Sequence, residues 1–362
     1  MTLTHMRCTD CGCKDVKAQR TYTIKHGEQR TIYACDACGG TFSSTSNTPM
    51  AHLKTPISVI VQVLSNLSTL LRSTEPTVLT TGWGRTEGPV WHAEGFVTFV
   101  DLAGSRLLRW DPTGQVTVVR EQTGEGNGCT LDRQGRLLMC EGADHRRITR
   151  MEAAGTVTTL AERWQGKRFN KPNDIVCRSD GSIFFTDPEL RLPPAQRELG
   201  FSGVFRIDPQ GHVHLATDEC EYPNGLAFSP DESILYVAIS RLDERCFQED
   251  ARGEVCPHRR IRAFDVAPDG SLRQNRVFCE MASAAPGVPD GLKVDTAGRV
   301  WCVGSGGIWV FAPSGEVIGM VPTPEVVRNL AFGGPDLRTL YLTPGGSLAQ
   351  LEVTTPGMGA GH

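Results

Sequence analysis

The sequence lacks a long hydrophobic run and a signal-like start. Its most apolar stretch, residues 56–71, covers only 16 positions and is interrupted by Ser, Gln and Asn, whereas a membrane-spanning helix needs about 20 apolar residues. Residues 1–10 do not show the basic and then apolar pattern of a secretion signal. We therefore expect a soluble, cytoplasmic protein with no membrane partner.

Hydrophobic residues are also few, at 39% of the 362 positions, and aromatic residues make up only 7%. Glycine (39) and proline (22) are abundant instead, which favours many short strands joined by tight turns over long helices. The 13 cysteines are an odd number. Without a secretion signal, this count predicts thiols or metal ligands rather than disulfides.

Charge divides the chain into two parts. Residues 1–72 hold eight Lys/Arg against four Asp/Glu, and the remainder holds 29 against 37. A basic segment therefore precedes a longer acidic one, which implies two parts of different character.

The basic segment contains two CxxC pairs, Cys8/Cys11 and Cys35/Cys38, which are 23 residues apart. Two such pairs can converge on one tetrahedral zinc ion, and so small a segment would need the metal for most of its folding energy. We predict a zinc-ribbon-like head over residues 1–55. Cys13 is then a spare thiol or a rival of Cys11, and unligated thiols are the alternative.

Residues 56–78 are predicted to form a helix and a linker, because apolar residues recur there at helical spacing. With its cysteines and the Thr-Phe-Ser tail at 41–43, the whole segment resembles the zinc-ribbon start of insertion-sequence transposases, which leads into DNA-binding helices. This resemblance and the positive excess would imply weak contact with nucleic acid. Because basic residues are few and no helix-turn-helix is complete, we favour a fused remnant or a scaffold role.

One local pattern occurs six times in the acidic part: a carboxylate or amide residue, then Gly or Asp, then an apolar strand. Its copies begin at Glu87, Asn127, Asn173, Asn224, Asp290 and Asn329, the last without the Gly. The starts are 40, 46, 51, 66 and 39 residues apart, a spacing typical of four-stranded propeller blades. We predict an all-β, six-bladed β-propeller over residues 79–354 and a flexible tail over 355–362. The longest interval holds a polar insertion, residues 241–259, expected as a surface loop at the mouth.

Equivalent positions of propeller blades meet at the central axis, so the six polar side chains are expected to form one ring. Singly, each motif has a simpler explanation, because Pro-Asn-Gly and Pro-Asp-Gly are common turn sequences. Together, Glu87, Asn173, Asn224 and Asp290 offer two carboxylates and two amide carbonyls, which suit a hard divalent cation. Calcium is favoured, with magnesium, manganese or zinc as alternatives.

The same stretches resemble a known family. Residues 86–91 (TEGPVW), 170–176 (NKPNDIV), 185–188 (FTDP), 222–231 (YPNGLAFSPD) and 288–292 (VPDGL) are similar to the gluconolactonase, regucalcin and senescence-marker-protein family of propeller lactonases, over about residues 80–353. The resemblance implies that Glu87, Asn173, Asn224 and Asp290 bind the metal of a lactone hydrolase and that Asp290 is its catalytic carboxylate. The cation would polarise the lactone carbonyl while Asp290 takes a proton from water or attacks directly.

Five further residues are candidates for substrate binding. Asn127 and Asn329 occupy the remaining ring positions, where they could bind substrate hydroxyls or only close the blades. Lys171 and Arg168 lie near the third motif, and His145 could project into the mouth, although a solvated charge or a structural histidine explains each as well. Residues 189–199 depart from the family pattern near the expected entrance, so the substrate preference of relatives transfers poorly.

Two other functions remain open at this point. The same metal site could hydrolyse a phosphotriester, as related propellers do. Alternatively, the propeller could be a non-catalytic ligand sensor whose head contacts DNA, which would show as salt-sensitive DNA binding. The sequence does not determine the oligomeric state or the natural lactone.

Overall fold

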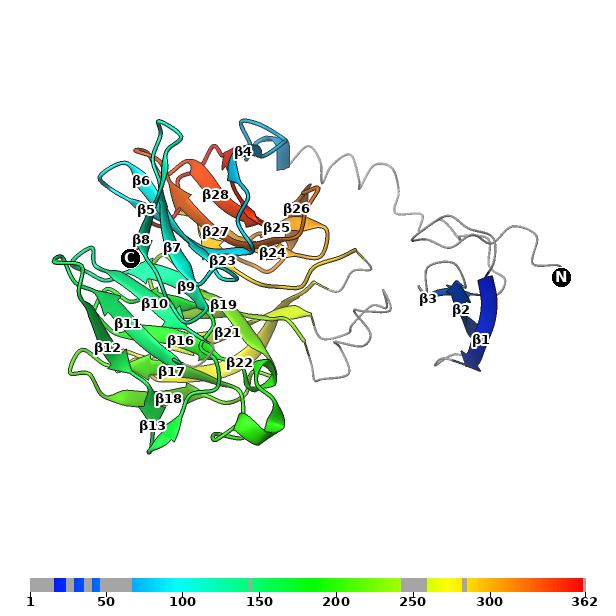
Figure 1. The fold of residues 1–362 in the computed structure, drawn as a ribbon, viewed down its shortest axis with the longest axis horizontal. Helices are drawn as coiled ribbons and strands as arrows, with labels where there is room; N and C mark the ends of the chain where they lie inside the picture. The colour runs from blue at the N-terminus through cyan, green and yellow to red at the C-terminus, as the bar shows by residue number, and fades with distance from the viewer. Residues whose placement is uncertain are drawn as a thin grey trace.

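A computed structural model describes residues 67–142, 145–241, 259–281 and 285–360, and the backbone of residues 16–23, 29–35 and 41–45. The described part consists almost entirely of strands and turns (Figure 1). Within it, no helix has both the length and the apolar character that crossing a membrane requires. Its dominant feature is a set of six four-stranded antiparallel sheets.

The six sheets are the blades of a propeller. Five of them are built from consecutive strands. From the innermost to the outermost strand, blade one contains β5 (Thr86–His92), β6 (Phe96–Asp101), β7 (Arg106–Trp110) and β8 (Val116–Arg120); blade two contains β9 (Gly126–Leu131), β10 (Leu137–Glu141), β11 (Arg147–Met151) and β12 (Val157–Ala161); blade three contains β15 (Ile175–Cys177), β16 (Ile183–Asp187), β17 (Gly203–Ile207) and β18 (Val213–Thr217); blade four contains β19 (Pro223–Phe228), β20 (Ile234–Ile239), β21 (Arg260–Val266) and β22 (Leu272–Glu280); blade five contains β23 (Leu292–Val294), β24 (Val300–Gly304), β25 (Gly307–Phe311) and β26 (Val317–Pro322). The inner strands contact one another in a closed circle, with β27 next to β5, so the predicted six-bladed propeller is confirmed for the described residues.

Blade six closes the circle with strands from both ends of the propeller. It contains β27 (Val327–Gly333), β28 (Thr339–Pro344), β29 (Ser347–Glu352) and, as the outermost strand, β4 (Thr77–Thr81). Just before β4, Leu67 and Leu70 are buried in a cluster between blades five and six. The described segment 67–76 therefore packs on the propeller, although we predicted a helix and linker up to residue 78.

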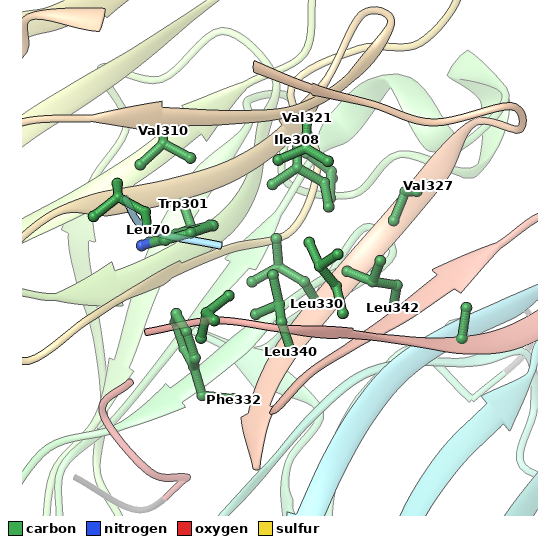
Figure 2. Close-up of a cluster of buried hydrophobic side chains, with 14 of the residues drawn as sticks. Leu70, Trp301, Ile308, Val310, Val321, Val327, Leu330, Phe332, Leu340 and Leu342 are labelled. Carbon is green, nitrogen blue, oxygen red and sulfur yellow. The ribbon is translucent and has the colours of Figure 1, made fainter. Parts of the chain in front are cut away.

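Six hydrophobic clusters hold the blades together, one between each pair of neighbours. Figure 2 shows the cluster between blades five and six, where Trp301 and Ile308 face Leu330 and Leu340. The second strand of each blade is almost wholly buried because both of its faces are covered by neighbouring blades. Each blade thus depends on its neighbours for burial.

The six repeated motifs lie at the start of the inner strands. In four blades the pairing between the first and second strands shifts register at the motif, as in a β-bulge that re-aims a side chain. The motif glycines are required by close packing between blades: a Cβ on Gly225 would lie 2.2 Å from the carbonyl oxygen of Asp290, and one on Gly291 would lie 2.1 Å from Oδ1 of Asn329. The motifs therefore join adjacent blades as well as forming turns.

Two smaller sheets complete the described strands. β1 (Val16–Thr23), β2 (Gln29–Cys35) and β3 (Thr41–Thr45) form an antiparallel three-stranded sheet, and β13 (Arg163–Trp164) pairs with β14 (Lys167–Arg168). Of the predicted zinc ligands, Cys8, Cys11 and Cys38 lie outside the described residues, and Cys35 is the last residue of β2. Residues 56–66 of the predicted helix and residues 242–258 of the predicted mouth loop also lie outside them.

The C-terminal tail departs from the prediction. We expected flexibility from residue 355, but the amide of Met358 donates to the carbonyl oxygen of Val294 (3.0 Å), and the amide of Gly357 donates to that of Leu337 (2.9 Å). Met358, Gly359 and Ala360 line a small cavity together with residues from all six inner strands. Backbone hydrogen bonds and packing thus hold these residues at the propeller axis, where we had expected a flexible tail.

Candidate active site

All six ring positions occupy the first strand of their blade or the residues just before it. Glu87 lies in β5, Asn127 in β9, Asn224 in β19 and Asn329 in β27, while Asn173 and Asp290 directly precede β15 and β23. Five of these side chains are buried, with 3% to 5% of their surface exposed. Asp290 is only partly buried, so it is the ring residue most accessible from the cavity.

Among the described residues, hydrogen-bond donors reach only one of the two carboxylate oxygens of Glu87. Its Oε2 accepts hydrogen bonds from the amide of Gly88 (2.9 Å) and from Nδ2 of Asn329 (3.1 Å). Nδ2 of Asn329 also donates to Oδ2 of Asp174 (3.3 Å), a buried carboxylate next to Asn173. No donor in the described part of the chain reaches Oε1 of Glu87, so that oxygen can bind a cation.

Ser240 fixes the orientation of the Asn224 amide. The Ser240 hydroxyl donates its proton to the carbonyl oxygen of Pro289 (2.6 Å) and therefore accepts a hydrogen bond from Nδ2 of Asn224 (3.0 Å). Oδ1 of Asn224 is consequently turned away from Ser240, and it is buried without a hydrogen-bond partner. A buried acceptor of this kind indicates a missing ligand.

Asn127 and Asn173 form a similar pair. Nδ2 of Asn127 donates to Oδ1 of Asn173 (3.1 Å), which leaves a second lone pair on that oxygen. Oδ1 of Asn127 is itself buried without a hydrogen-bond partner. These amide oxygens, together with Glu87 and Asp290, fit a hard cation that prefers oxygen ligands.

The carboxylates oppose one another electrostatically. Burial, and then the charges of Glu87 and Asp174, hold the pKa of Asp290 well above its usual range. Burial followed by the charge of Asp174 likewise raises the pKa of Glu87, and burial raises the pKa of Asp174. A divalent cation would relieve this repulsion, because opposite charge favours the ionised form of a carboxyl group.

A cavity of about 410 Å³ lies over these residues. Glu87, Asn127, Asn173, Asn224 and Asp290 are part of its lining, so the structure brings all four predicted metal ligands to one cavity. The lining also includes Tyr222 and five arginines: Arg85, Arg191, Arg241, Arg259 and Arg328.

The other residues that we predicted to contact substrate lie outside the described lining of this cavity. His145 is 2.6 Å from the buried carboxylate of Glu141, and Nη2 of Arg168 donates to the carbonyl oxygen of His145 (3.2 Å). Lys171 forms an ion pair with Glu125. None of these three residues, nor Asn329, is in the described lining of the cavity; in the structure they support surrounding loops or the ring itself.

Sequence reasoning missed Asp174 and the arginines. Asp174 could have been noticed because it stands where the other motifs carry Gly or an apolar residue. Arg328 directly precedes a ring residue, Arg241 and Arg259 bound the insertion, and Arg191 lies in the segment that departs from the family pattern. No sequence signal brings these four arginines together, because they come from three different blades.

The fold and site define a six-bladed propeller with an oxygen-rich polar ring at one cavity. Comparison identifies the family: the chain belongs to the SMP-30/gluconolactonase/LRE-like family, whose model matches residues 85–345. It is 27% identical over 294 residues to a gluconolactonase of Zymomonas mobilis, covering 75% of this chain and 79% of that protein. It is 30% identical over 267 residues to a pentonolactonase of Haloferax volcanii, covering 72% and 81%. The solved structure of a gluconolactonase from Xanthomonas campestris matches with a TM-score of 0.69 and 34% identity, over 80% of this chain and 92% of that one.

Proposed function

We propose that this chain is a hydrolase that opens a small sugar-type lactone with the help of one divalent cation. The observation that carries the proposal is the convergence of Glu87, Asn173, Asn224 and Asp290 on one cavity. The family membership supports it, because relatives carry the names gluconolactonase and pentonolactonase.

The proposed cation ligands are Oε1 of Glu87, the Oδ1 atoms of Asn173 and Asn224, and the carboxylate of Asp290. The unpartnered oxygen of Asn224 and the mutual repulsion of the carboxylates support this set. Calcium is the proposed ion, since an all-oxygen shell with room for water suits it; magnesium, manganese and zinc are the alternatives to test. When bound, the ion would polarise the lactone carbonyl and stabilise negative charge on its oxygen.

The chain's own residues then carry the proton transfers. Asp290 reaches the cavity and takes a proton from the attacking water, whose oxygen forms a bond to the carbonyl carbon. The ring C–O bond breaks, and the proton passes from Asp290 to the departing ring oxygen, which gives a hydroxy acid. Asn127 accepts a hydrogen bond from a substrate hydroxyl through its unpartnered Oδ1, while Asn329 and Ser240 hold the ligands in position.

The test is hydrolysis of a lactone panel, with and without chelator, by the wild type and by Asp290→Asn and Glu87→Gln. We expect both variants to lose activity at least about 100-fold with unchanged circular dichroism, because Asp290→Asn removes the acid–base group and Glu87→Gln removes a charged cation ligand. Asp269→Asn is the control, because this exposed carboxylate only accepts hydrogen bonds from Ser271 in an outer turn. Full activity in either site variant, or in chelated protein, would contradict the proposal.

For the N-terminal head we propose a zinc ribbon with Cys8, Cys11, Cys35 and Cys38 as ligands and a scaffold role. The three-stranded sheet β1–β3 supports it, because the second CxxC pair begins where β2 ends. Zinc analysis of the full chain should give one zinc per chain and much less in Cys38→Ser. The six described propeller cysteines are buried free thiols, which suits a reducing compartment, and we propose the cytoplasm as the location.

A further inference from the structure

The cavity over the candidate active site carries far more positive charge than a neutral lactone needs. Among the described residues of its lining there are five guanidinium groups and two carboxylates, an excess of three positive charges before any cation binds. The hydroxyl groups of a neutral sugar lactone need only hydrogen-bonding partners, which the amide and carboxylate side chains of the ring already supply. A concave site with this charge attracts anions and raises their local concentration.

Among the described residues, Arg191 is a lining arginine with a buried and unpartnered guanidinium nitrogen. It ends the short 3-10 helix Glu189–Arg191, between β16 and β17. Within the described chain its guanidinium makes no hydrogen bond and no ion pair, and Nη1 is buried without a partner. Buried polar groups are almost always hydrogen-bonded in native structures, so this donor points to a ligand.

The neighbouring arginines support an anion-binding wall. Arg328 donates only to the carbonyl oxygen of Gly345 (3.2 Å), and neither Arg328 nor Arg85 is ion-paired with a carboxylate in the described residues. Arg259 is 3% exposed and is held by a hydrogen bond from Nη1 to Oγ of Ser305 (3.1 Å). Arg241 lies over the ring of Tyr222, with 5.7 Å between its guanidinium carbon and the ring centroid. Contacts with Gly345, Ser305 and Tyr222 thus hold three of the five arginines at the wall of the cavity.

We propose that the natural substrate is an anionic lactone, carrying a carboxylate or a phosphate group, and that Arg191 binds this group while the Glu87 and Asp290 side of the cavity takes the lactone carbonyl. The planar guanidinium fork matches both anions through paired hydrogen bonds. A cavity of about 410 Å³ has room for a six-carbon lactone with such a substituent. The inference rests on the proposed lactone hydrolysis for its chemistry, but the anion site can be tested separately.

The first experiment compares three lactones of one sugar series: glucono-1,5-lactone, its 6-phosphate, and a lactone of glucaric acid, which carries a carboxylate. We expect KM for at least one anionic lactone to be about tenfold or more below that of the neutral one, since hydrogen bonds to charged groups contribute this much. Added salt should raise KM for the anionic lactone only. Comparison of the phosphorylated lactone with the carboxylated lactone decides which anionic group the natural substrate carries. A neutral lactone with an equal or lower KM than both anionic lactones would overturn the proposal.

Variants of Arg191 give the second experiment. Arg191→Gln should raise KM for the preferred anionic lactone about tenfold or more while KM for the neutral lactone stays within about twofold. Arg191→Lys should recover part of the loss, because it keeps the charge but not the fork. The control is Arg276→Gln, which removes an arginine paired with Asp265 on the surface of blade four and should change neither KM. Equal effects of Arg191→Gln on both lactones would contradict an anion-binding role.

Binding of the products separates this proposal from the proposed function. By calorimetry, the wild type should bind 6-phosphogluconate or glucarate more tightly than gluconate, and Arg191→Gln should remove the difference. If no lactone is opened but this difference is found, lactone hydrolysis fails and the anion site stands. If gluconate binds as tightly as both 6-phosphogluconate and glucarate, the proposed anion site is wrong even when lactones are hydrolysed.

Discussion

Glu87, Asp174 and Asp290 bring three carboxylates together, two of them buried and the third partly buried, which is costly for a folded protein without a cation. Each of their pKa values is raised by burial, and the charge of Asp174 raises those of Glu87 and Asp290 further. The neutral amide of Asn329 donates hydrogen bonds to Glu87 and Asp174. Because this amide carries no charge, it does not remove the repulsion between the carboxylates. The site is therefore built for binding at the expense of stability, as active sites commonly are.

This repulsion predicts an unusual effect of the site variants in the absence of metal. Asp290→Asn and Glu87→Gln should each stabilise the chelated protein at neutral pH, because burial and the neighbouring carboxylates raise the pKa of both groups. Urea unfolding in the presence of a chelator measures this difference. In saturating calcium the order should reverse, because only the wild type gains the free energy of metal binding. A lower urea midpoint of both variants in chelator would show that the carboxylates are structural.

His92 provides a pH-dependent contribution away from the site. Its ring is 8% exposed, stacks on Phe96 with 4.3 Å between centroids, and bonds through Nε2 to Oγ1 of Thr98 (2.9 Å). Burial lowers its pKa to about 4 from the ordinary 6.5. Between pH 6.5 and pH 4, the unfolded chain therefore binds a proton at His92 that the folded chain does not bind. The contribution of His92 to folding stability is fully present above pH 6.5 and is lost as the pH falls through this window.

We predict that this histidine removes about 3 kcal/mol of folding free energy between pH 7 and pH 4, from a shift of about 2.5 pKa units. His92→Gln keeps a hydrogen-bonding group near Thr98 but cannot take up the proton. Urea midpoints of both proteins at several pH values measure the effect. The stability gap between wild type and variant should narrow or reverse toward pH 4, and a constant gap would rule out the linkage.

At the scale of single residues, the sequence was most informative where a side chain repeats. The six ring positions could be located because each blade presents an equivalent residue at the axis, and the proposal of a hard cation follows from the residue types. His145, Lys171 and Arg168 were assigned from proximity in sequence, and the structure places them in contacts with Glu141, Glu125 and a backbone carbonyl. The proposed role of Arg191, by contrast, follows only from its three-dimensional neighbours.

At the scale of elements, the sequence predicted strands well and chain ends poorly. Hairpin turns and a blade-length repeat locate the sheets, because these are local features. The C-terminal tail has no strand pattern, which predicts flexibility. In the structure, however, Gly357 packs on the ring of Phe332, and the amide of Met358 donates a hydrogen bond to Val294 in the inner strand β23. Such docking depends on a surface formed by six blades, so no local sequence signal reports it.

The tail predicts a measurable protection of Cys129. This buried thiol and residues 358–360 line the same small cavity on the axis, and burial raises the pKa of the Cys129 thiol well above its usual range. Ending the chain after residue 355 should expose the cavity to water and speed alkylation of Cys129 about tenfold or more, because thiol reactivity follows exposure and pKa. Peptide mass spectrometry measures it. Cys302, buried between blades four and five, is the internal control and should stay protected.

If both thiols are alkylated faster in the shortened chain, the tail stabilises the whole fold rather than covering one cavity. If neither changes, the tail does not control access to the channel. Only selective labelling of Cys129 fits a tail that covers the axis.

At the scale of the whole molecule, the propeller is closed by a strand that precedes it in sequence. β4 pairs with β29 to complete blade six, and Leu67 and Leu70 fill the cluster between blades five and six. The amide of Arg72 also donates to the carbonyl oxygen of Glu352 (2.9 Å), which ties the two ends of the propeller together. Residues 67–76 therefore pack with the propeller in the described part of the chain, whereas charge and periodicity had grouped them with the segment that precedes it.

Graded truncation tests this boundary. A chain that starts at Leu67 should keep full lactone hydrolysis, with an unfolding midpoint within about 2 °C of the full chain, because every described propeller contact is retained. A chain that starts at Thr77 keeps β4 but loses two buried leucines, each of which contributes about 2–5 kcal/mol, so it should be several kcal/mol less stable and still closed. A chain that starts at Gly82 leaves β29 as an open edge strand and should aggregate. Thermal unfolding and size-exclusion chromatography distinguish the three. Equal stability of all three chains would mean that β4 does not close the propeller, whereas loss of activity in the first chain would mean that the head helps to shape the active site.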